Sequence, residues 1–181
     1  MICDYFGSRM IQNWDKIPGG YITTINSVAL DDVLRVYYDV LQIHHEFCDI
    51  ASDGSFDRYS RIFSQVFYVA KLDAGVVGYS VYCVKPMLTL CGIRKTAVLY
   101  SMAVDREHRG QGIGEQLLII SVREMQLNGI NKIVLYVGKE NIPAQLLYTK
   151  LGFVVTGELA GASDGGEPYY RMVLRLPAIP A

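Results

Sequence analysis

The sequence lacks the charge imbalance, paired cysteines and long apolar runs that mark several classes of protein. Its 17 basic and 18 acidic side chains leave a formal charge of −1 over 181 residues, which argues against a nucleic-acid partner bound through overall basicity. The four cysteines form no C-x2-C pair of the kind that binds zinc or exchanges disulfides, so we expect reduced thiols and no metal site. No stretch approaches the roughly 18 apolar residues of a membrane span, and charged residues interrupt the N-terminus where a secretory signal would be apolar. We therefore expect a cytoplasmic protein with no nucleic-acid or membrane partner.

Hydrophobic residues make up 51% of the chain, enough for a large core. A chain of this length ordinarily folds as one domain and buries about 70% of the surface that its unfolded form exposes. Residues 1–19 carry little periodic pattern and end in a Pro-Gly-Gly turn signal. We therefore predict an N-terminal extension over residues 1–19 and a single domain over residues 20–181.

Patterns typical of strands and of helices alternate along the chain. Runs rich in β-branched and aromatic residues predict strands, and apolar residues three or four positions apart predict helices. The predicted strands cover residues 21–27, 66–71, 76–84, 96–104, 133–137, 153–156 and 169–176, and the predicted helices cover residues 29–43, 58–64, 113–128 and 142–151. Residues 85–95 are expected to form a loop. This order predicts a mixed α/β sheet covered by helices, with a ligand bound where strands meet helix N-termini.

The most informative motif joins the strand at residues 96–104 to the helix that follows it. The motif reads Arg109-Gly110-Gln111-Gly112-Ile113-Gly114. Glycine permits positive φ angles and a close approach of the backbone to a ligand, and the N–H groups at the start of a helix favour phosphate oxygens. The segment is therefore a candidate anion-binding loop. The alternative is that its glycines only form a tight turn between strand and helix.

Two common phosphate-binding motifs do not fit this loop. The dinucleotide-binding pattern G-x-G-x-x-G fails in either register, because Glu115 or Leu117 stands where the third glycine belongs. A P-loop fails as well, because the next lysine is Lys132, beyond the helix. A dinucleotide-dependent oxidoreductase is accordingly a minor alternative.

The motif instead resembles the R/Q-x-x-G-x-G/A signature of the GNAT N-acetyltransferase superfamily, with Arg109, Gly112 and Gly114 in its fixed positions. The resemblance extends to residues 99–105 before the loop and to residues 141–153 after the next strand. It is nearest to the ribosomal-protein alanine acetyltransferases and similar N-terminal acetyltransferases. It implies an α/β fold whose mixed, mostly antiparallel central sheet has about six to seven strands and carries helices on both faces.

The resemblance further implies acetyl-CoA as the co-substrate and no metal. Backbone groups near the end of the strand at residues 96–104 would pair with the pantetheine arm, and amides of the glycine loop would bind the pyrophosphate. The residues implied in cofactor binding are Met102, Ala103, Val104, Arg109, Gly110, Gln111, Gly112, Ile113, Gly114, Asn141, Ala144 and Tyr148. For Arg109 the alternative is a contact with the loop itself, and for Asn141 it is a helix cap.

The implied reaction is direct attack of a neutral primary amine on the thioester, with a backbone N–H stabilising the oxyanion. Tyr148 matches the tyrosine that in this family protonates or hydrogen-bonds the departing thiolate, and the alternative is a core aromatic residue. Tyr136 stands in a strand where several members hold glutamate or histidine. Tyrosine, with a reference pKa near 10, is a poor base. Tyr136 is therefore expected to position a water or the acceptor.

Other candidate bases are weaker. Residues 96–104 contain no carboxylate. Glu46, beside His44 and His45, would lie either near the acceptor or at an exposed helix end, and His108 is expected to face solvent. Deprotonation at pH 7 costs roughly 4.6 kcal/mol for lysine but only about 1–1.4 kcal/mol for an α-amine. The lack of an obvious base therefore slightly favours a peptide or protein α-amine over a small-molecule amine as acceptor.

These observations predict an acetyl-CoA-dependent N-acetyltransferase. The alternative is a non-catalytic acyl-CoA-binding relative that acts as a sensor or subunit. Residues 160–168 are similar to the loop with which N-terminal acetyltransferases cover a peptide, although Gly, Asp and Ser are common in any turn. Homodimers are common in the superfamily, and this chain is a candidate for one.

Overall fold

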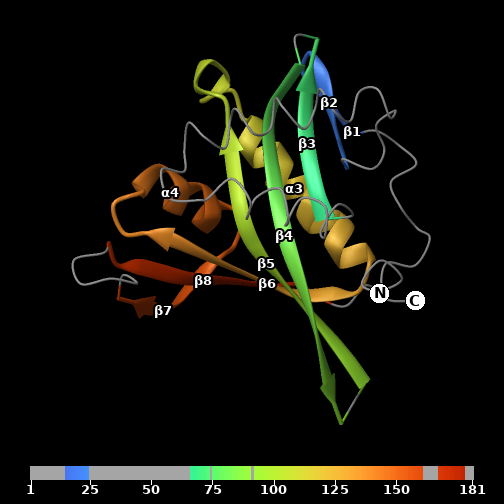
Figure 1. The fold of residues 1–181 in the computed structure, drawn as a ribbon, viewed down its shortest axis with the longest axis vertical. Coiled ribbons are helices and arrows are strands. Elements are labelled where there is room, and N and C mark those ends of the chain that lie inside the picture. Colours follow the sequence, from blue (N-terminus) through green and yellow to red (C-terminus); the bar gives the residue numbers. More distant parts are fainter. Residues whose placement is uncertain (1–14, 25–65, 74, 91, 161–166, 178–181) are drawn as a thin grey trace, which may run out of the picture. The chain divides into compact units, whose positions relative to one another are not determined.

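A computed structural model describes residues 15–24, 66–73, 75–90, 92–160 and 167–177 of the chain (Figure 1). These residues belong to two compact units. The first unit contains residues up to Cys83 together with Tyr100–Glu124, and the second contains Val84–Leu99 and the residues from Met125 onward. Strands β4 (Gly75–Thr89) and β5 (Gly92–Val104) contribute to both units.

The first unit contains antiparallel strands in the order β1-β2-β3-β4, with the end of β5 following. Strands β1 (Asp15–Ile17), β2 (Gly20–Thr24) and β3 (Phe67–Leu72) lead up to β4. The β3–β4 pair is the hairpin predicted from the two β-branched and aromatic runs. Its aromatic rings pack edge-on, with centroids 6.0 Å apart for Phe67 and Tyr79 and 6.1 Å apart for Tyr68 and Tyr82.

Helix α3 (Ile113–Leu127) packs closely on β4 in the first unit. The buried hydroxyls of Tyr82 and Ser121 share a hydrogen bond of 2.7 Å. A Cβ at Gly78 would lie 3.1 Å from the carbonyl oxygen of Ala103 and 3.2 Å from the Leu117 side chain. The absence of a side chain at Gly78 therefore lets the helix and the end of β5 approach β4, which fixes both ends of the glycine loop.

The second unit contains β6 (Ile130–Gly138), β7 (Val154–Leu159), β8 (Tyr169–Arg175) and helix α4 (Ile142–Lys150). Strand β6 runs parallel to β5 and antiparallel to β8, and β8 also pairs with β7. A parallel neighbour needs a crossover connection, which α3 supplies between β5 and β6. None of the helices among the described residues is long and apolar enough to span a membrane.

The predicted α/β class with a mixed, mostly antiparallel sheet is confirmed. Eight strands are present among the described residues rather than six to seven, because β1 is a three-residue strand too short to show alternation in sequence. The helices predicted at residues 29–43 and 58–64 lie outside the described residues, as does the predicted strand beyond Thr24. The domain boundary at residue 20 stays a prediction.

The loop predicted at residues 85–95 is wrong. Strand β4 continues to Thr89 and β5 begins at Gly92, and the Thr89 hydroxyl donates to the Gly92 carbonyl at 2.7 Å. Lys85, Pro86 and Gly92 have the composition of a loop, and this part of the hairpin has no buried face to impose alternation on its sequence. We call the hairpin segment formed by residues 85–90 and 92–95 the β4–β5 arm.

Candidate functional site

In the first unit, the segment between β5 and the glycine loop is held by a network of local hydrogen bonds. Residues Arg106–His108 form a short 3₁₀ helix, η4, which Asp105 caps by accepting from the Glu107 N–H at 3.0 Å. The other carboxylate oxygen of Asp105 lies 3.3 Å from Nδ1 of His108. The Asp105 N–H donates to the Val77 carbonyl at 2.9 Å, which ties the start of the segment to β4.

Arg109 and Gln111 hold the glycine loop against this segment. The exposed Arg109 side chain donates from Nε to the carbonyl of Val104 at 3.1 Å. The Gln111 side-chain amide donates to the Glu107 carbonyl at 3.2 Å. Arg109 therefore contacts the end of β5, which ties the start of the glycine loop to that strand.

The glycines of the loop give it a backbone that other residues would adopt only with strain. Gly110 and Gly112 have φ angles of 74° and 80°, and a Cβ at either position would meet nothing within 4 Å. The glycines are therefore required by conformation. Space lies open beside the loop at both positions.

The start of α3 presents backbone donors. Its first helical hydrogen bond runs from the Gln116 N–H to the Gly112 carbonyl at 3.0 Å. The N–H groups of Gly112, Ile113 and Gly114 precede that bond, so none has a helical carbonyl four residues back. Ile113 is buried and anchors the turn, whereas Gly112 is exposed. Donors at the positive end of the helix dipole, beside open space, suit an anionic group such as a phosphate.

Met102, Ala103 and Val104 form the end of β5 in the first unit, and all three are half-buried. The parallel ladder that β5 forms with β6 covers Lys95 to Val98 and ends before them. The resemblance to the GNAT family implies that the backbone groups of these residues, rather than their side chains, pair with the ligand.

In the second unit, Asn141 caps helix α4. Its side-chain oxygen accepts from the Ala144 N–H at 3.2 Å, and its carbonyl accepts from the Gln145 N–H at 3.1 Å. Pro143 occupies the first turn, where the missing N–H costs no hydrogen bond. The capping role considered for Asn141 is therefore present, and Ala144 lies half-buried in the same turn.

Tyr148 lies on the buried side of α4, with 9% of its surface exposed. Its ring packs against Phe153 with centroids 5.8 Å apart and planes tilted by 60°. Burial raises the pKa of Tyr148 to about 12, because the phenolate would lose solvation. Among the described residues its hydroxyl has no hydrogen-bond partner. Tyr148 is thus both a core aromatic residue and a protonated donor at neutral pH.

Tyr136 lies on β6 with 50% of its surface exposed, opposite Arg171 of β8. The next pair on the same face joins Gly138 to Tyr169, whose side chain is also exposed. One face of the second unit therefore presents two tyrosines from neighbouring strands. Phenol groups in this position can orient a polar ligand or a water.

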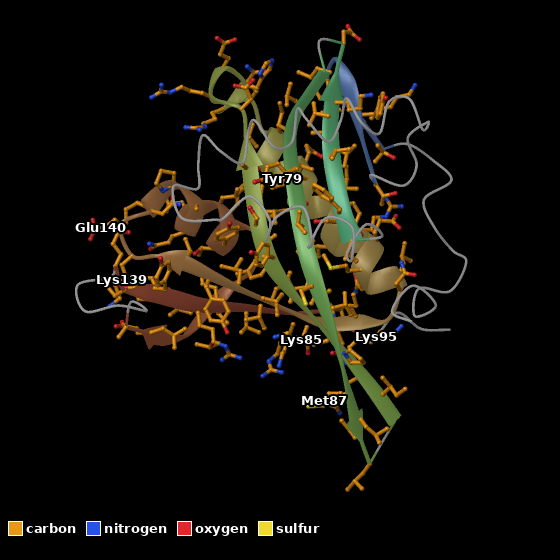
Figure 2. The ribbon with its side chains drawn as sticks, viewed as in Figure 1. Tyr79, Lys85, Met87, Lys95, Lys139 and Glu140 are labelled. Carbon is orange, nitrogen blue, oxygen red and sulfur yellow. The ribbon has the colours of Figure 1, made fainter. Side chains whose placement is uncertain are left out.

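Sequence reasoning missed the contacts that fix the turn between β6 and α4. The Gln145 amide donates to the carbonyls of Gly138 and Lys139, at 2.9 and 2.8 Å. The Lys139 ammonium forms an ion pair with Glu158 and lies 5.0 Å from the ring centroid of Tyr170. Figure 2 labels Lys139 next to Glu140. The hydrogen bond with Glu158 raises the pKa of Lys139. No sequence spacing predicts Glu158 as the partner of Lys139, because the two residues are 19 positions apart in the chain.

The predicted site residues divide between the two units. Those from Met102 to Gly114 belong to the first unit, and Tyr136, Asn141, Ala144 and Tyr148 belong to the second. His44, His45 and Glu46, and residues 161–166 of the predicted peptide loop, lie outside the described residues. Within the described ranges, no three His, Cys, Asp or Glu side chains gather in a way that could hold a metal ion.

Comparison with known sequences finds a match between residues 32–153 and the model of the acetyltransferase (GNAT) family. Among curated proteins, mycothiol acetyltransferase from Corynebacterium glutamicum (strain R) is 37% identical over 57 residues, which cover 32% of this chain and 20% of that protein. The chain therefore matches only about a fifth of the length of such relatives.

Comparison with solved structures finds similar folds at low sequence identity. The NatC complex, solved with a Gag peptide and CoA bound, aligns with a TM-score of 0.73 and 18% identity over 86% of this chain and 98% of that one. The ribosomal-protein-S18-alanine N-acetyltransferase of Escherichia coli aligns with a TM-score of 0.65 and 22% identity. The alignment covers 90% of this chain and 96% of that chain. At these identities the likeness concerns the fold.

Proposed function

Because the chain belongs to the acetyltransferase (GNAT) family, we propose that it is an N-acetyltransferase that transfers the acetyl group of acetyl-CoA to a primary amine. The observation that carries the proposal is the glycine loop. Its two positive-φ glycines border open space, and the first N–H groups of α3 precede the helical hydrogen bonds. Residues 109–114 carry one cationic side chain and no anionic one, which suits a diphosphate.

Acetyl-CoA would be held by backbone groups more than by side chains. The amides from Arg109 to Gly114 would bind its diphosphate, and the backbone from Met102 to Val104 would pair with its pantetheine arm. Asn141 and Ala144, at the start of α4, are the further proposed contacts. Arg109 would act through the shape of the loop, because its Nε already donates to Val104.

We assign Tyr148 the role of a hydrogen-bond donor to the departing sulfur. A tyrosine with a pKa of about 12 stays protonated at neutral pH. Complete proton transfer to a thiolate of ordinary pKa, near 8.5, would be uphill by roughly 5 kcal/mol. A donated hydrogen bond still stabilises the charge that develops on sulfur. The proton that ends on the CoA thiol then comes from the attacking amine, which loses one proton as the amide forms.

The proposed acceptor is the α-amine of a peptide or protein, with a small-molecule amine as the broader class. An α-amine needs little help from a base at neutral pH. The half-exposed Tyr136 stands in the strand where, by the family resemblance, several members hold glutamate or histidine. NatC was solved with a Gag peptide bound. The Escherichia coli enzyme is named for acetylation of an alanine of ribosomal protein S18. Tyr136 would position the amine or a water. We further propose that the protein is cytoplasmic, that residues 20–181 form a single domain, and that the chain forms a homodimer.

The decisive experiment follows CoA thiol release by the full chain with acetyl-CoA and a panel of amines. The panel contains peptides with free N-termini, the same peptides with blocked N-termini, lysine with a blocked α-amine, and polyamines. We expect thiol release matched by one acetyl group on the free N-terminal peptides, as seen by mass spectrometry. If acetyl-CoA raises the melting temperature but no amine promotes thiol release, the chain is a binding module and the proposal is wrong.

A further inference from the structure

The β4–β5 arm exposes a cluster of bulky apolar side chains in the second unit. Leu88 has 83% of its surface exposed and Met87 has 57%, and Leu90 and Ile93 are exposed as well. Strand β6 pairs with β5 only from Lys95 onward, so the arm beyond Lys95 lies outside that ladder. In Figure 1 the two green strands run on past β6 to the hairpin turn. We call Met87, Leu88, Leu90 and Ile93 the apolar tip.

The apolar tip is exposed on both faces of the hairpin. Met87 and Leu88 are adjacent in β4, and successive side chains of a strand point to opposite faces. Both are largely exposed, so among the described residues neither face of the arm is covered at this point. A flat protein partner would cover one face and leave the other in water. A medium that surrounds the tip would cover both.

Three cationic residues flank the apolar tip on the two strands of the arm. Lys85 precedes Met87, and Arg94 and Lys95 follow Ile93, whereas residues 84–104 contain no aspartate or glutamate. Figure 2 shows Lys85 and Lys95 at the base of the arm and Met87 farther out. The whole chain carries a formal charge of −1, so this concentration of positive charge is local. A bilayer, whose anionic headgroups lie above its apolar acyl chains, presents partners for the cations and for the apolar tip in the same order.

The outer edge of the arm is a poor template for a second copy of the chain. The β3–β4 ladder ends at Val81, and Pro86 and Lys85 lie on β4 beyond it. Proline offers no N–H to a neighbouring strand, and an edge lysine opposes the same lysine of an identical chain. The strand edge therefore disfavours self-pairing.

From these observations we propose that the β4–β5 arm docks the protein on an anionic lipid bilayer. The apolar tip enters the boundary between headgroups and acyl chains, and the exposed Lys85 and Arg94 meet lipid phosphates. The half-buried Lys95 adds positive charge at the base of the arm, where its ammonium donates to the Asn128 carbonyl at 3.4 Å. Three residues of strand span about 10 Å, comparable with the depth of such interfacial insertion. The proposal concerns a lipid surface and no spanning helix, and it revises the sequence-based expectation of no membrane partner. It does not rest on the proposed acetyltransferase activity.

The test is co-sedimentation of the full chain with vesicles of phosphatidylcholine, with or without phosphatidylglycerol. We expect binding to the mixed vesicles that weakens as salt is raised, and little binding to phosphatidylcholine alone. Leu88→Ser and Leu90→Ser should each lower the partition coefficient about tenfold. Lys85→Gln and Arg94→Gln should each lower it about fivefold. The control is Leu127→Ser, a leucine at the end of α3 that is also exposed (53%) but lies outside the arm, and this variant should bind as the wild type does.

Each variant is compared by circular dichroism and melting temperature, which should be unchanged because the tip side chains lie in solvent. Equal vesicle binding by Leu88→Ser, Leu90→Ser and the wild type would overturn the proposal. Failure of the wild-type chain to co-sediment with the anionic vesicles would also overturn it. A dimer in sedimentation velocity that Leu88→Ser dissociates in the absence of lipid, without vesicle binding by the wild type, would assign the tip to a second copy instead.

Discussion

At Tyr148, packing and chemistry can be separated by removing one oxygen atom. Tyr148→Phe keeps the ring against Phe153 and deletes only the hydroxyl, which has no hydrogen-bond partner among the described residues. We expect kcat to fall about 10-fold to 100-fold, the value of a hydrogen bond to a charged group, while the Kd of acetyl-CoA changes little. Steady-state kinetics and calorimetry on the same preparation measure the two quantities. Unchanged turnover would remove Tyr148 from the reaction.

The raised pKa of Tyr148 also predicts how stability depends on pH. In the unfolded chain the Tyr148 phenol has a pKa of about 10, whereas in the folded chain its pKa is about 12. Within that window the unfolded state binds fewer protons, so the free energy of unfolding falls with rising pH, by up to about 1.4 kcal/mol per pH unit for this group. Below the window Tyr148 contributes no pH dependence.

Urea unfolding across the alkaline range measures this slope. The wild type should lose stability more steeply than Tyr148→Phe, because the variant has no phenol at that position. Parallel curves for the two proteins would mean that burial does not hold the proton of Tyr148.

At the scale of elements, the role of the glycine loop in CoA binding can be tested by comparing Gly112 with Gly129, a glycine outside the loop that has nearly the same positive φ angle. Gly112 has a φ of 80° and Gly129 a φ of 77°, and a Cβ at either would meet nothing within 4 Å. Gly112→Ala and Gly129→Ala should each cost about 1–2 kcal/mol of stability through the left-handed backbone. Only Gly112→Ala should also weaken CoA binding, as measured by calorimetry. Similar CoA affinities for the two variants would indicate that the glycines serve only the turn.

Helix α4 offers a test of whether Asn141 does more than cap. Asn141→Ala should cost about 1 kcal/mol, because the Ala144 N–H loses its acceptor, and Asn141→Asp should restore the cap. If Asn141 also contacts acetyl-CoA, Asn141→Asp regains the melting temperature but not the affinity. Recovery of both would assign the residue to capping alone.

The elements that were predicted well are those in which the pattern of apolar residues along the sequence reflects which side chains are buried. Strand β3, α3, β6 and α4 each show a clear period or a continuous apolar run, and their predicted bounds lie within a few residues of the structure. The outer part of the β4–β5 arm has no buried face, so Lys85 to Lys95 has the composition of a loop. In the candidate site, the loop was predicted from its glycine spacing, and Tyr148 was predicted from the resemblance to the GNAT family. The ion pair between Lys139 and Glu158 was not, because it joins residues that only strand pairing brings together.

At the scale of the whole molecule, family membership rests on features spread over residues 32–153 rather than on one motif. Strand, glycine loop, helix, strand and helix follow one another as the GNAT resemblance implies, and the fold aligns with solved acetyltransferases along most of the chain. The acceptor is less constrained, since no side chain among the described residues dictates one amine. The donor is therefore the part of the account on which everything else depends.

The most direct test of that dependence is isothermal titration of the purified full chain with CoA, acetyl-CoA and NAD. The account predicts saturable 1:1 binding of CoA and acetyl-CoA, and no binding of NAD at the same concentrations. Absence of heat with both CoA ligands from well-folded protein, together with tight binding of NAD, would contradict it.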